Sequence, residues 1–253
     1  MSDPIEDLLS APQFPRASRY DPHWVLENQM GLNPIWLTEW LCQGMHLHPG
    51  MRVLDLGCGR ALSSIFLAQE YELEVWATDL WVPATDNRKR IDQASLSGRV
   101  FPIHADARSL PFAEDFFDAI VCVDAYIYFG TDDLYLDYLH KFVKPGGGIG
   151  MVVPGFMQEV EGPLPEHLIP FWAQECWTWH TVDWWQHLWN RTGLVEVQLA
   201  DSLPEGWKLW LQWKKARRLA GDSSPELASD IQVLEVDLGR YMGWIRMTAQ
   251  RKD

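Results

Sequence analysis

The sequence predicts an α/β fold with a mainly parallel sheet whose two faces are covered by helices. Between residues 52 and 153, short apolar runs alternate with stretches in which apolar residues recur at helical spacing. This alternation of strand and helix is typical of parallel strands joined by helical crossovers. A glycine turn follows the first strand and acidic residues follow the next three, at the edge where such sheets bind ligands.

Seven strands are expected along the chain. Five belong to the alternating region and two follow it, at residues 52–56, 73–78, 100–104, 117–123, 149–153, 194–199 and 244–250. Apolar periodicity predicts the helices, at residues 62–70, 87–94, 132–142, 182–191, 207–220 and within 225–241.

The composition changes along the chain suggest how it is organised. Residues 1–22 are rich in proline and polar groups and are expected to form a loosely structured arm, with helices following up to residue 46. We therefore separate an N-terminal arm with helices, residues 1–46, from a main domain, residues 47–253. The main domain contains a tryptophan-rich region at about 154–192 and a helical insertion at about 205–240.

Charge and cysteine usage argue against several classes of partner. The 253 residues carry a formal net charge of −14, which repels nucleic acids and anionic lipid surfaces. The four cysteines show neither CxxC spacing nor histidine pairing, so neither a disulfide framework nor a metal site is expected. With no signal peptide and no apolar run of roughly 20 residues, we expect a cytoplasmic protein without stable membrane association. The oligomeric state is left open, and a homo-oligomer is compatible with the sequence.

A glycine turn after the first strand is the most informative local feature. The strand runs through Asp55 into Gly57 and Gly59, which allow a tight turn and a close approach of the backbone to a ligand. Such a turn before a helix commonly binds pyrophosphate, but a carboxylate at Asp55 favours an ammonium group instead. A dinucleotide site also needs a third glycine, and Leu62 stands there. A nicotinamide or flavin enzyme is therefore the weaker interpretation.

Acidic residues end the next three strands as well. Asp79 closes the second strand, where an acidic side chain commonly binds ribose hydroxyls, and Asp106 and Asp124 close the third and fourth. Each acid alone has a structural explanation as a helix cap or turn residue. Together with Asp55 they place negative charge along one edge of the sheet, which a cationic sulfonium ligand would neutralise.

Five segments resemble, in order and at normal spacing, the motifs of class I S-adenosylmethionine-dependent methyltransferases: VLDLGCGRA, ATDL, HADARSLPF, FDAIVCVDAYIYF and VKPGGGIGMVV. The resemblance covers roughly residues 45–155 closely and the last strands loosely. It implies a Rossmann-like methyltransferase fold, S-adenosyl-L-methionine as cofactor, and residues 144–147 as a tight turn before the fifth strand. The pattern is most similar to the small-molecule branch, with a weaker similarity to cyclopropane-fatty-acid-synthase-like enzymes.

The resemblance also implies which residues bind the cofactor. The glycine turn would line its methionine and ribose portions, Asp79 would hold the ribose hydroxyls, and Asp106 would accept from the adenine amino group. Asp124 or its backbone would face the methionine amino end, and Tyr20 in the N-terminal arm would fold over the cofactor. The complete expected set is Tyr20, Asp55, Gly57, Cys58, Gly59, Asp79, Leu80, Trp81, Asp106, Ala107, Asp124 and Ala125.

The acceptor pocket is expected among aromatic residues. Nine of the 15 tryptophans lie between Trp172 and Trp213, a density that suits a lid, an apolar pocket or a cage for a substituted ammonium. Trp185 and Trp189, four residues apart on a helix, are expected to pack in the core instead. We name five candidate acceptor-binding residues, with core or surface packing as the alternative for each: Tyr126, Tyr128, Trp177, Trp179 and His180.

His180 is the candidate general base, since it lies in the aromatic segment directly before a predicted helix cap. His104 is expected to be a packed strand residue. The predicted function is methyl transfer to an oxygen or nitrogen atom of a small aromatic, apolar or amine-containing molecule. Two alternatives stay open, a lipid-modifying enzyme of the cyclopropane-synthase type and a cofactor-binding protein without catalytic activity.

Overall fold

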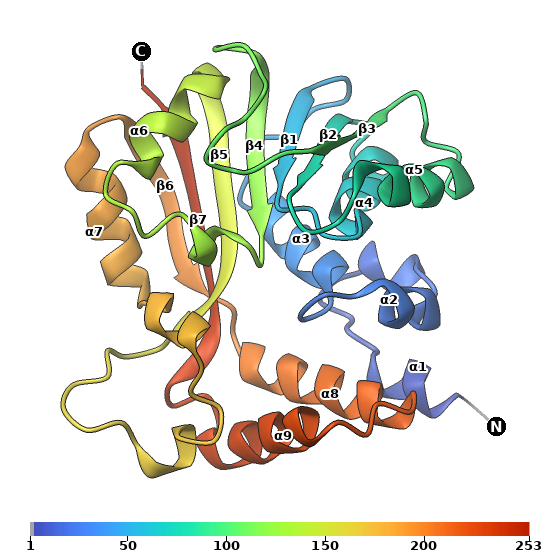
Figure 1. Cartoon of the computed structure of the whole chain (residues 1–253), viewed down its shortest axis with the longest axis vertical. Coiled ribbons are helices and arrows are strands. Elements are labelled where there is room, and N and C mark those ends of the chain that lie inside the picture. Colours follow the sequence, from blue (N-terminus) through green and yellow to red (C-terminus); the bar gives the residue numbers. More distant parts are fainter. Residues whose placement is uncertain (1–2, 253) are drawn as a thin grey trace.

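The computed structural model describes residues 3–252, which form one seven-stranded sheet with helices on both faces (Figure 1). The strand order is β3-β2-β1-β4-β5-β7-β6. Strands β1 to β5 pair in parallel, and β7 runs antiparallel to both β5 and β6. The predicted mainly parallel α/β sheet is therefore confirmed.

The strands lie close to their predicted positions. Their bounds are β1 Arg52–Leu56, β2 Glu74–Asp79, β3 Val100–His104, β4 Phe117–Val123, β5 Val143–Phe156, β6 Val195–Ser202 and β7 Met242–Arg251. The central strands β1 and β4 are buried almost throughout, which explains their continuous apolar sequences. Chain order reverses between β1 and β4, so a crevice forms there at the carboxyl ends of the strands.

Helices cover the sheet in two groups. Helices α3 (Pro34–Cys42), α4 (Leu62–Glu70) and α5 (Ala84–Gln93) pack on one face, and α6 (Tyr135–Leu139) and α7 (Val182–Thr192) on the other (Figure 1). Helix α4 has the predicted bounds. Helix α6 is shorter than the predicted 132–142, because the chain tightens into a 3₁₀ turn at His140–Phe142.

Helix α7, which precedes β6, shows how local sequence signals determine where an element begins and ends. The Thr181 hydroxyl accepts from the Trp184 amide at the start of α7, and Gly193 ends the helix with φ of 71°. Between these caps, Trp185 and Trp189 are fully buried, as the spacing predicted. Both help to fill the core between α7 and the sheet.

The N-terminal residues are more ordered than predicted. Helix α1 (Pro4–Leu8) is capped by Asp3, a 3₁₀ turn spans Ala17–Arg19, and α2 (Pro22–Asn28) is capped by Asp21. The buried Glu39 of α3 accepts from the backbone amide of Ala17 at 2.7 Å. The predicted loose arm is wrong, because capped turns and this buried carboxylate attach it to the domain.

Strand β5 is also longer than predicted, since it includes the Lys-Pro-Gly-Gly segment at 144–147. This segment does not separate two elements. It is an irregular stretch within the strand, where the pairing register with β4 shifts between Phe117 and Ala119 and Gly146 takes φ of 75°.

Two further helices and a long connection lie at the carboxyl ends of the strands. Helices α8 (Gly206–Leu219) and α9 (Pro225–Asp237) form a hairpin below the sheet, beside α1 (Figure 1). The connection from β5 to α7 contains short 3₁₀ turns at Glu166–Leu168 and Gln174–Thr178. The buried carboxylate of Asp237, at the end of α9, lies 2.9 Å from the His167 ring and attaches this connection to the hairpin.

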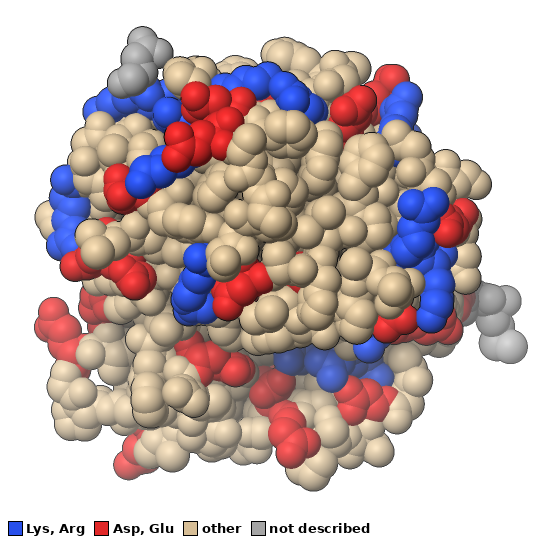
Figure 2. Space-filling model, turned by 45° about the horizontal axis from the view of Figure 1, so that its top comes forward, with Lys and Arg blue, Asp and Glu red and all other residues tan. Residues whose placement is uncertain are grey.

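The surface carries both signs of charge. On the face shown in Figure 2, Lys and Arg lie beside Asp and Glu and form no separate basic patch. Among residues 3–252, no helix is long and apolar enough to cross a membrane.

Candidate cofactor and acceptor site

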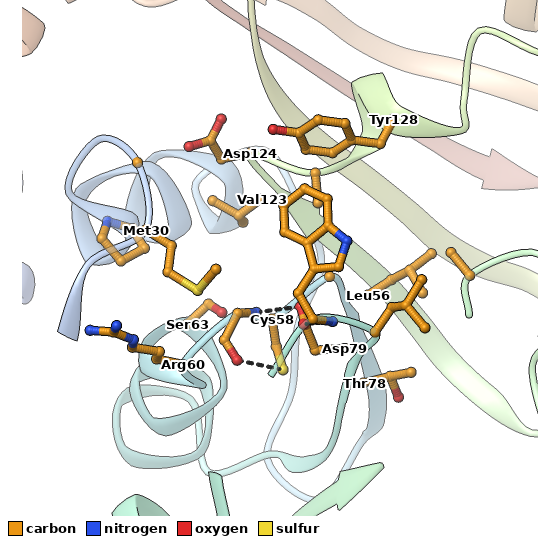
Figure 3. Close-up of a pocket in the computed structure, with 18 of the residues that line it drawn as sticks. Met30, Leu56, Cys58, Arg60, Ser63, Thr78, Asp79, Val123, Asp124 and Tyr128 are labelled. Atoms are coloured by element: carbon orange, nitrogen blue, oxygen red, sulfur yellow. Dashed lines mark hydrogen bonds between the residues drawn. The ribbon is translucent and has the colours of Figure 1, made fainter. Parts of the chain in front are cut away.

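A cavity opens at the crevice between β1 and β4. Its walls come from the ends of four successive strands, from the turn after β1, and from the loop that joins α2 to α3. Figure 3 shows Thr78 and Asp79 at one end of the cavity and Asp124 and Tyr128 at the other, with Met30 at the side. Ten of the twelve predicted cofactor residues line this cavity: Gly57, Cys58, Gly59, Asp79, Leu80, Trp81, Asp106, Ala107, Asp124 and Ala125.

The glycine turn has the geometry its sequence requires. Gly57 and Gly59 have φ of 73° and 52°, in the left-handed region that favours glycine. Any Cβ at Gly57 would collide with the side chain of Ala125, so the β1 and β4 ends approach closely only because Gly57 has none. A Cβ at Gly59 would lie 3.0 Å from the sulfur of Met30, which covers the turn from the α2–α3 loop.

Asp79 organises this end of the cavity. One carboxylate oxygen accepts from the Gly59 amide at 2.8 Å, and the other accepts from the amides of Trp81 and Val82, each at 2.8 Å. A carboxylate has about four acceptor positions, so one remains, on the oxygen bonded to Gly59. That position is where a ligand hydroxyl can donate.

Asp55 lies behind the turn and not in the cavity wall. Its side chain is fully buried, and one oxygen accepts from the hydroxyls of Ser63 and Ser64, each at 2.6 Å. The other oxygen has no hydrogen-bond partner. Burial raises the pKa of this carboxyl to about 6. The hydrogen bonds from the two serine hydroxyls lower the pKa and so offset part of the effect of burial. Asp55 holds the start of α4 against β1.

The part of the cavity where the resemblance places the adenine is open to solvent. The Arg108 amide donates to the Asp106 carboxylate at 2.8 Å, and the carboxylate remains 41% exposed. Trp81 is 63% exposed, and its ring meets the ring of Tyr128 edge-on with centroids 4.9 Å apart. These side chains form a partly aromatic edge suited to a flat ring system.

Asp124 stands at the other end, directly after β4. It has φ of 58°, which directs its carboxyl against Gly31 of the α2–α3 loop. Burial raises the pKa of Asp124 to about 7, with Lys214 and the Leu32 amide lowering it and Glu175 raising it further. A carboxyl with this pKa exchanges its proton near neutral pH, as a general base must.

A second cavity of about 600 Å³ adjoins the first. Met30, Gly31, Leu32, Asp124 and Tyr128 line both cavities and so form a shared wall. The second cavity, here called the acceptor cavity, is otherwise enclosed by the β5–α7 connection, the α8–α9 hairpin and the strand ends of β5 and β7. Its aromatic walls are Tyr128, Phe171, Trp172, Trp179, Trp210 and Trp244.

The structure brings two of the five predicted acceptor residues to this cavity, Tyr128 and Trp179. Tyr126 is only 1% exposed and packs among the core rings of Phe129, Trp185 and Trp189. Trp177 is 66% exposed and lines neither cavity. In both segments, side chains two positions apart face different surroundings. Tyr126 lies in the core while Tyr128 lines the cavity, and Trp177 faces solvent while Trp179 lines the cavity.

His180, the predicted base, also lies outside both cavities. Its ring stacks on Trp184 with centroids 3.6 Å apart, and burial lowers its pKa. Its carbonyl accepts from the Phe156 amide, which fixes the chain at the end of β5. Asp124 has the position at the shared wall that His180 lacks, and its raised pKa suits a group that takes up a proton.

Two further predictions differ from the structure. Tyr20 lies away from the cofactor cavity, because its hydroxyl donates to the Gln69 side chain at 2.8 Å on the outer side of α4. His104 is exposed and not packed, with its ring 2.8 Å from the Leu80 carbonyl. In both cases a polar partner outside the core holds the ring.

Several wall residues were not predicted from the sequence. The α2–α3 loop carries no motif, and Trp210 and Lys214 come from α8, far along the chain from the cofactor motifs. The one usable signal was the continuing tryptophan density up to Trp213, whose indole nitrogen donates to the Gly31 carbonyl at 2.8 Å. This bond attaches the loop to α8.

Comparison with known proteins is consistent with this geometry. Residues 53–147 match the family model described as a methyltransferase domain. Over 171 residues the chain is 28% identical to the methyltransferase GfsG of Streptomyces halstedii, covering 66% of this chain and 59% of that protein. It is 32% identical over 137 residues to a demethylmenaquinone methyltransferase of Mycobacterium sp. (strain KMS), covering 52% of this chain and 53% of the relative. The match thus spans little more than half the length of these relatives.

Solved structures share the fold. Phosphoethanolamine N-methyltransferase 2 of Haemonchus contortus, in complex with S-adenosyl-L-methionine, has a TM-score of 0.74 at 17% identity, covering 100% of this chain and 61% of that chain. Geranyl diphosphate C-methyltransferase of Streptomyces coelicolor A3(2) has a TM-score of 0.67 at 16% identity, covering 85% of this chain and 78% of that one. Residues 53–147 thus form a methyltransferase domain, and the sheet as a whole shares the fold of these S-adenosylmethionine-dependent methyltransferases.

Proposed function

We propose that this chain transfers the methyl group of S-adenosylmethionine to an oxygen or nitrogen atom of a small molecule bound in the acceptor cavity. The observation that carries the proposal is the shared wall. A crevice lined by the family's acidic strand ends meets a second, aromatic cavity at Asp124, Tyr128 and the α2–α3 loop. Methyl transfer needs donor and acceptor in contact along one line, and adjoining cavities provide this.

The residues of the first cavity fit the cofactor. Asp79 has one acceptor position left for a ribose hydroxyl, and the tight Gly57–Gly59 turn leaves space for a ligand against the backbone. The carboxylates of Asp79, Asp106 and Asp124 surround the cavity with negative charge, which suits a ligand bearing a sulfonium and an ammonium group. When bound, S-adenosylmethionine supplies an activated methyl group.

The chain's own residues would then orient the acceptor, exclude water and take up a proton. The tryptophan-rich region at 154–192 and the helical insertion at 205–240 supply most of the acceptor cavity, which supports a substrate-binding role for these two segments. Correct alignment of the reacting atoms contributes roughly 7–11 kcal/mol in well-oriented systems. Proton removal by a group such as Asp124 contributes about 10²–10⁴ in rate.

The proposal is tested by calorimetric titration of the full chain with S-adenosylmethionine and with S-adenosylhomocysteine, followed by a screen for transfer of a radiolabelled methyl group. The screen should include amines, phenols, carboxylates and an isoprenoid diphosphate, because C-methylation is an activity of one structural neighbour. We expect both cofactor forms to bind and the label to enter an amine or a hydroxyl compound. Failure of both to bind would contradict the proposal, and binding without transfer to any compound would favour the inactive alternative.

A further inference from the structure

The acceptor cavity has more carboxylates than cations in its walls. Its charged residues are Asp124, Glu175, Glu226, Asp230, Lys214 and Arg217. Both cations are already paired. The Lys214 ammonium lies 2.5 Å from the Asp230 carboxylate, and the Arg217 guanidinium lies 2.6 Å from Asp222, which is outside the cavity.

Three acids remain after these pairs are set aside. Within residues 3–252, Asp124, Glu175 and Glu226 make no ion pair. They come from different elements, the end of β4, the β5–α7 connection and the start of α9. Glu175 raises the pKa of Asp124, so these two carboxylates repel one another, and a bound cation would remove that repulsion.

The aromatic walls favour the same kind of ligand. Trp179 meets Phe171 and Trp210 with ring centroids 5.6 and 5.8 Å apart, and Trp210 meets Trp244 at 5.1 Å. Trp172 continues this surface through Phe156, on which it stacks. Indole faces attract organic cations, most strongly where water is excluded.

We propose that the methyl acceptor is an organic amine that enters the acceptor cavity as a cation and is methylated on nitrogen. This proposal rests on the proposed function of the site. A neutral phenol would leave Glu175 and Glu226 without a counter-charge, and Asp124 with only the Lys214 ammonium that Asp230 already pairs. A carboxylate would compete with Asp222 and Asp230 for Arg217 and Lys214. Neither alternative ligand would neutralise the excess of carboxylates over cations in the walls of the acceptor cavity.

The chemical step balances with groups at the shared wall. The bound ammonium first gives a proton to the Asp124 carboxylate, which frees the nitrogen lone pair. The nitrogen then forms a bond to the methyl carbon as the carbon–sulfur bond breaks, and that electron pair stays on sulfur. The products are a methylated ammonium and S-adenosylhomocysteine, with the first proton held on Asp124 until it passes to solvent.

A matched pair of probes tests the ligand class. Choline and 3,3-dimethylbutan-1-ol have nearly the same shape, but only choline is charged. Each is titrated into the full chain saturated with S-adenosylhomocysteine, with tryptophan fluorescence as the readout. We expect choline to bind about tenfold more tightly, a difference of about 1.4 kcal/mol. Equal affinities, tighter binding of the alcohol, or no binding of either probe would overturn the proposal.

Two variants test whether the preference for choline arises from the acids of the acceptor cavity. Glu175→Gln removes one unpaired acid from an exposed position and should weaken choline binding several-fold without changing the affinity for the alcohol. Glu166→Gln, an exposed acid outside the cavity, is the matched control and should change neither. Equal effects of the two variants would contradict the proposed location.

Activity separates this proposal from the proposed function. Methyl transfer to phenols but to none of the amines would overturn the amine proposal and leave the methyltransferase proposal standing. Failure of S-adenosylhomocysteine to bind would instead count against the proposed function itself.

Discussion

At the scale of single residues, Asp124 combines an unfavourable environment with a useful position. Its carboxyl is held against Gly31 in a left-handed backbone conformation, and burial raises its pKa to about 7. In an unfolded chain the pKa of an aspartate is near 3.9. The folded state therefore binds the proton more tightly, and the stability contributed by this group falls as the pH rises from about 4 to about 7.

Asp124→Asn removes this titration and keeps a residue type that tolerates positive φ. We expect the variant to be more stable than the parent chain by about 1–2 kcal/mol at pH 8, with a smaller difference at pH 5. Its methyl transfer should fall by about 10²–10⁴, because the proton acceptor is lost. Urea unfolding at the two pH values and initial rates measure both effects. Glu161→Gln, an exposed acid, should alter neither, and an unchanged stability of Asp124→Asn at pH 8 would argue against a raised pKa at Asp124.

Asp79 gives a prediction about the cofactor. Asp79→Ala removes the ribose acceptor and leaves the amides of Gly59, Trp81 and Val82 without their partner. The affinity for S-adenosylhomocysteine should fall about 100-fold, roughly 3 kcal/mol, by calorimetry. Asp79→Asn, which keeps a carbonyl acceptor but not the charge, should fall less. Equal affinity of Asp79→Ala and the parent chain would mean that the ribose is bound elsewhere.

At the scale of elements, the α2–α3 loop is the part of the shared wall that depends on packing. It is fixed by the Met30 contact over Gly59, by the Trp213 bond to Gly31, and by Asp124 against Gly31. A Cβ at Gly31 would collide with the Asp124 carboxyl, so close contact there requires glycine. Three separate elements thus meet in one short loop.

Gly31→Ala should displace this loop or the Asp124 side chain. Because Gly31 does not have positive φ, the expected effect comes from the collision alone. Overpacking of this kind costs about 1–3 kcal/mol. We expect a lower melting temperature and weaker binding of both cofactor and choline. Gly98→Ala, where an added Cβ meets nothing within 4 Å, is the control, and equal behaviour of the two variants would show that the loop moves freely.

The same loop shows why part of the site could not be predicted from the sequence. The cofactor residues follow strands whose apolar runs and glycine turn are local signals, and such signals also predict the bounds of α4 correctly. The loop and α8 reach the cavity only through tertiary packing, which has no local signature. The same is true of neighbours in a turn: Trp179 lines the acceptor cavity while Trp177 faces solvent. His180 was chosen for its chemistry, but its stacking on Trp184 depends on the fold.

At the scale of the whole molecule, the site joins segments from almost the full length of the chain. The cofactor cavity uses the strand ends and the loop after α2, and the acceptor cavity adds the β5–α7 connection and the α8–α9 hairpin. The hairpin also contacts α1 and, through the Trp213 bond to Gly31, the α2–α3 loop, so N-terminal segments pack against the last helices. A ligand in the cofactor cavity therefore contacts several elements that belong to the hydrophobic core.

This arrangement predicts that cofactor binding raises the stability of the entire chain. A ligand present at 100 times its dissociation constant adds about 2.7 kcal/mol, which corresponds to roughly 5–10 °C in melting temperature for a domain of this size. We expect such a shift with S-adenosylhomocysteine, as a single transition that tryptophan fluorescence and far-ultraviolet circular dichroism report at the same temperature. Asp79→Ala should show a smaller shift at the same ligand concentration, while Glu161→Gln should show the full one. If circular dichroism shifted but the fluorescence of the tryptophan-rich region did not, that region would unfold independently, and the shared wall would not couple the two cavities.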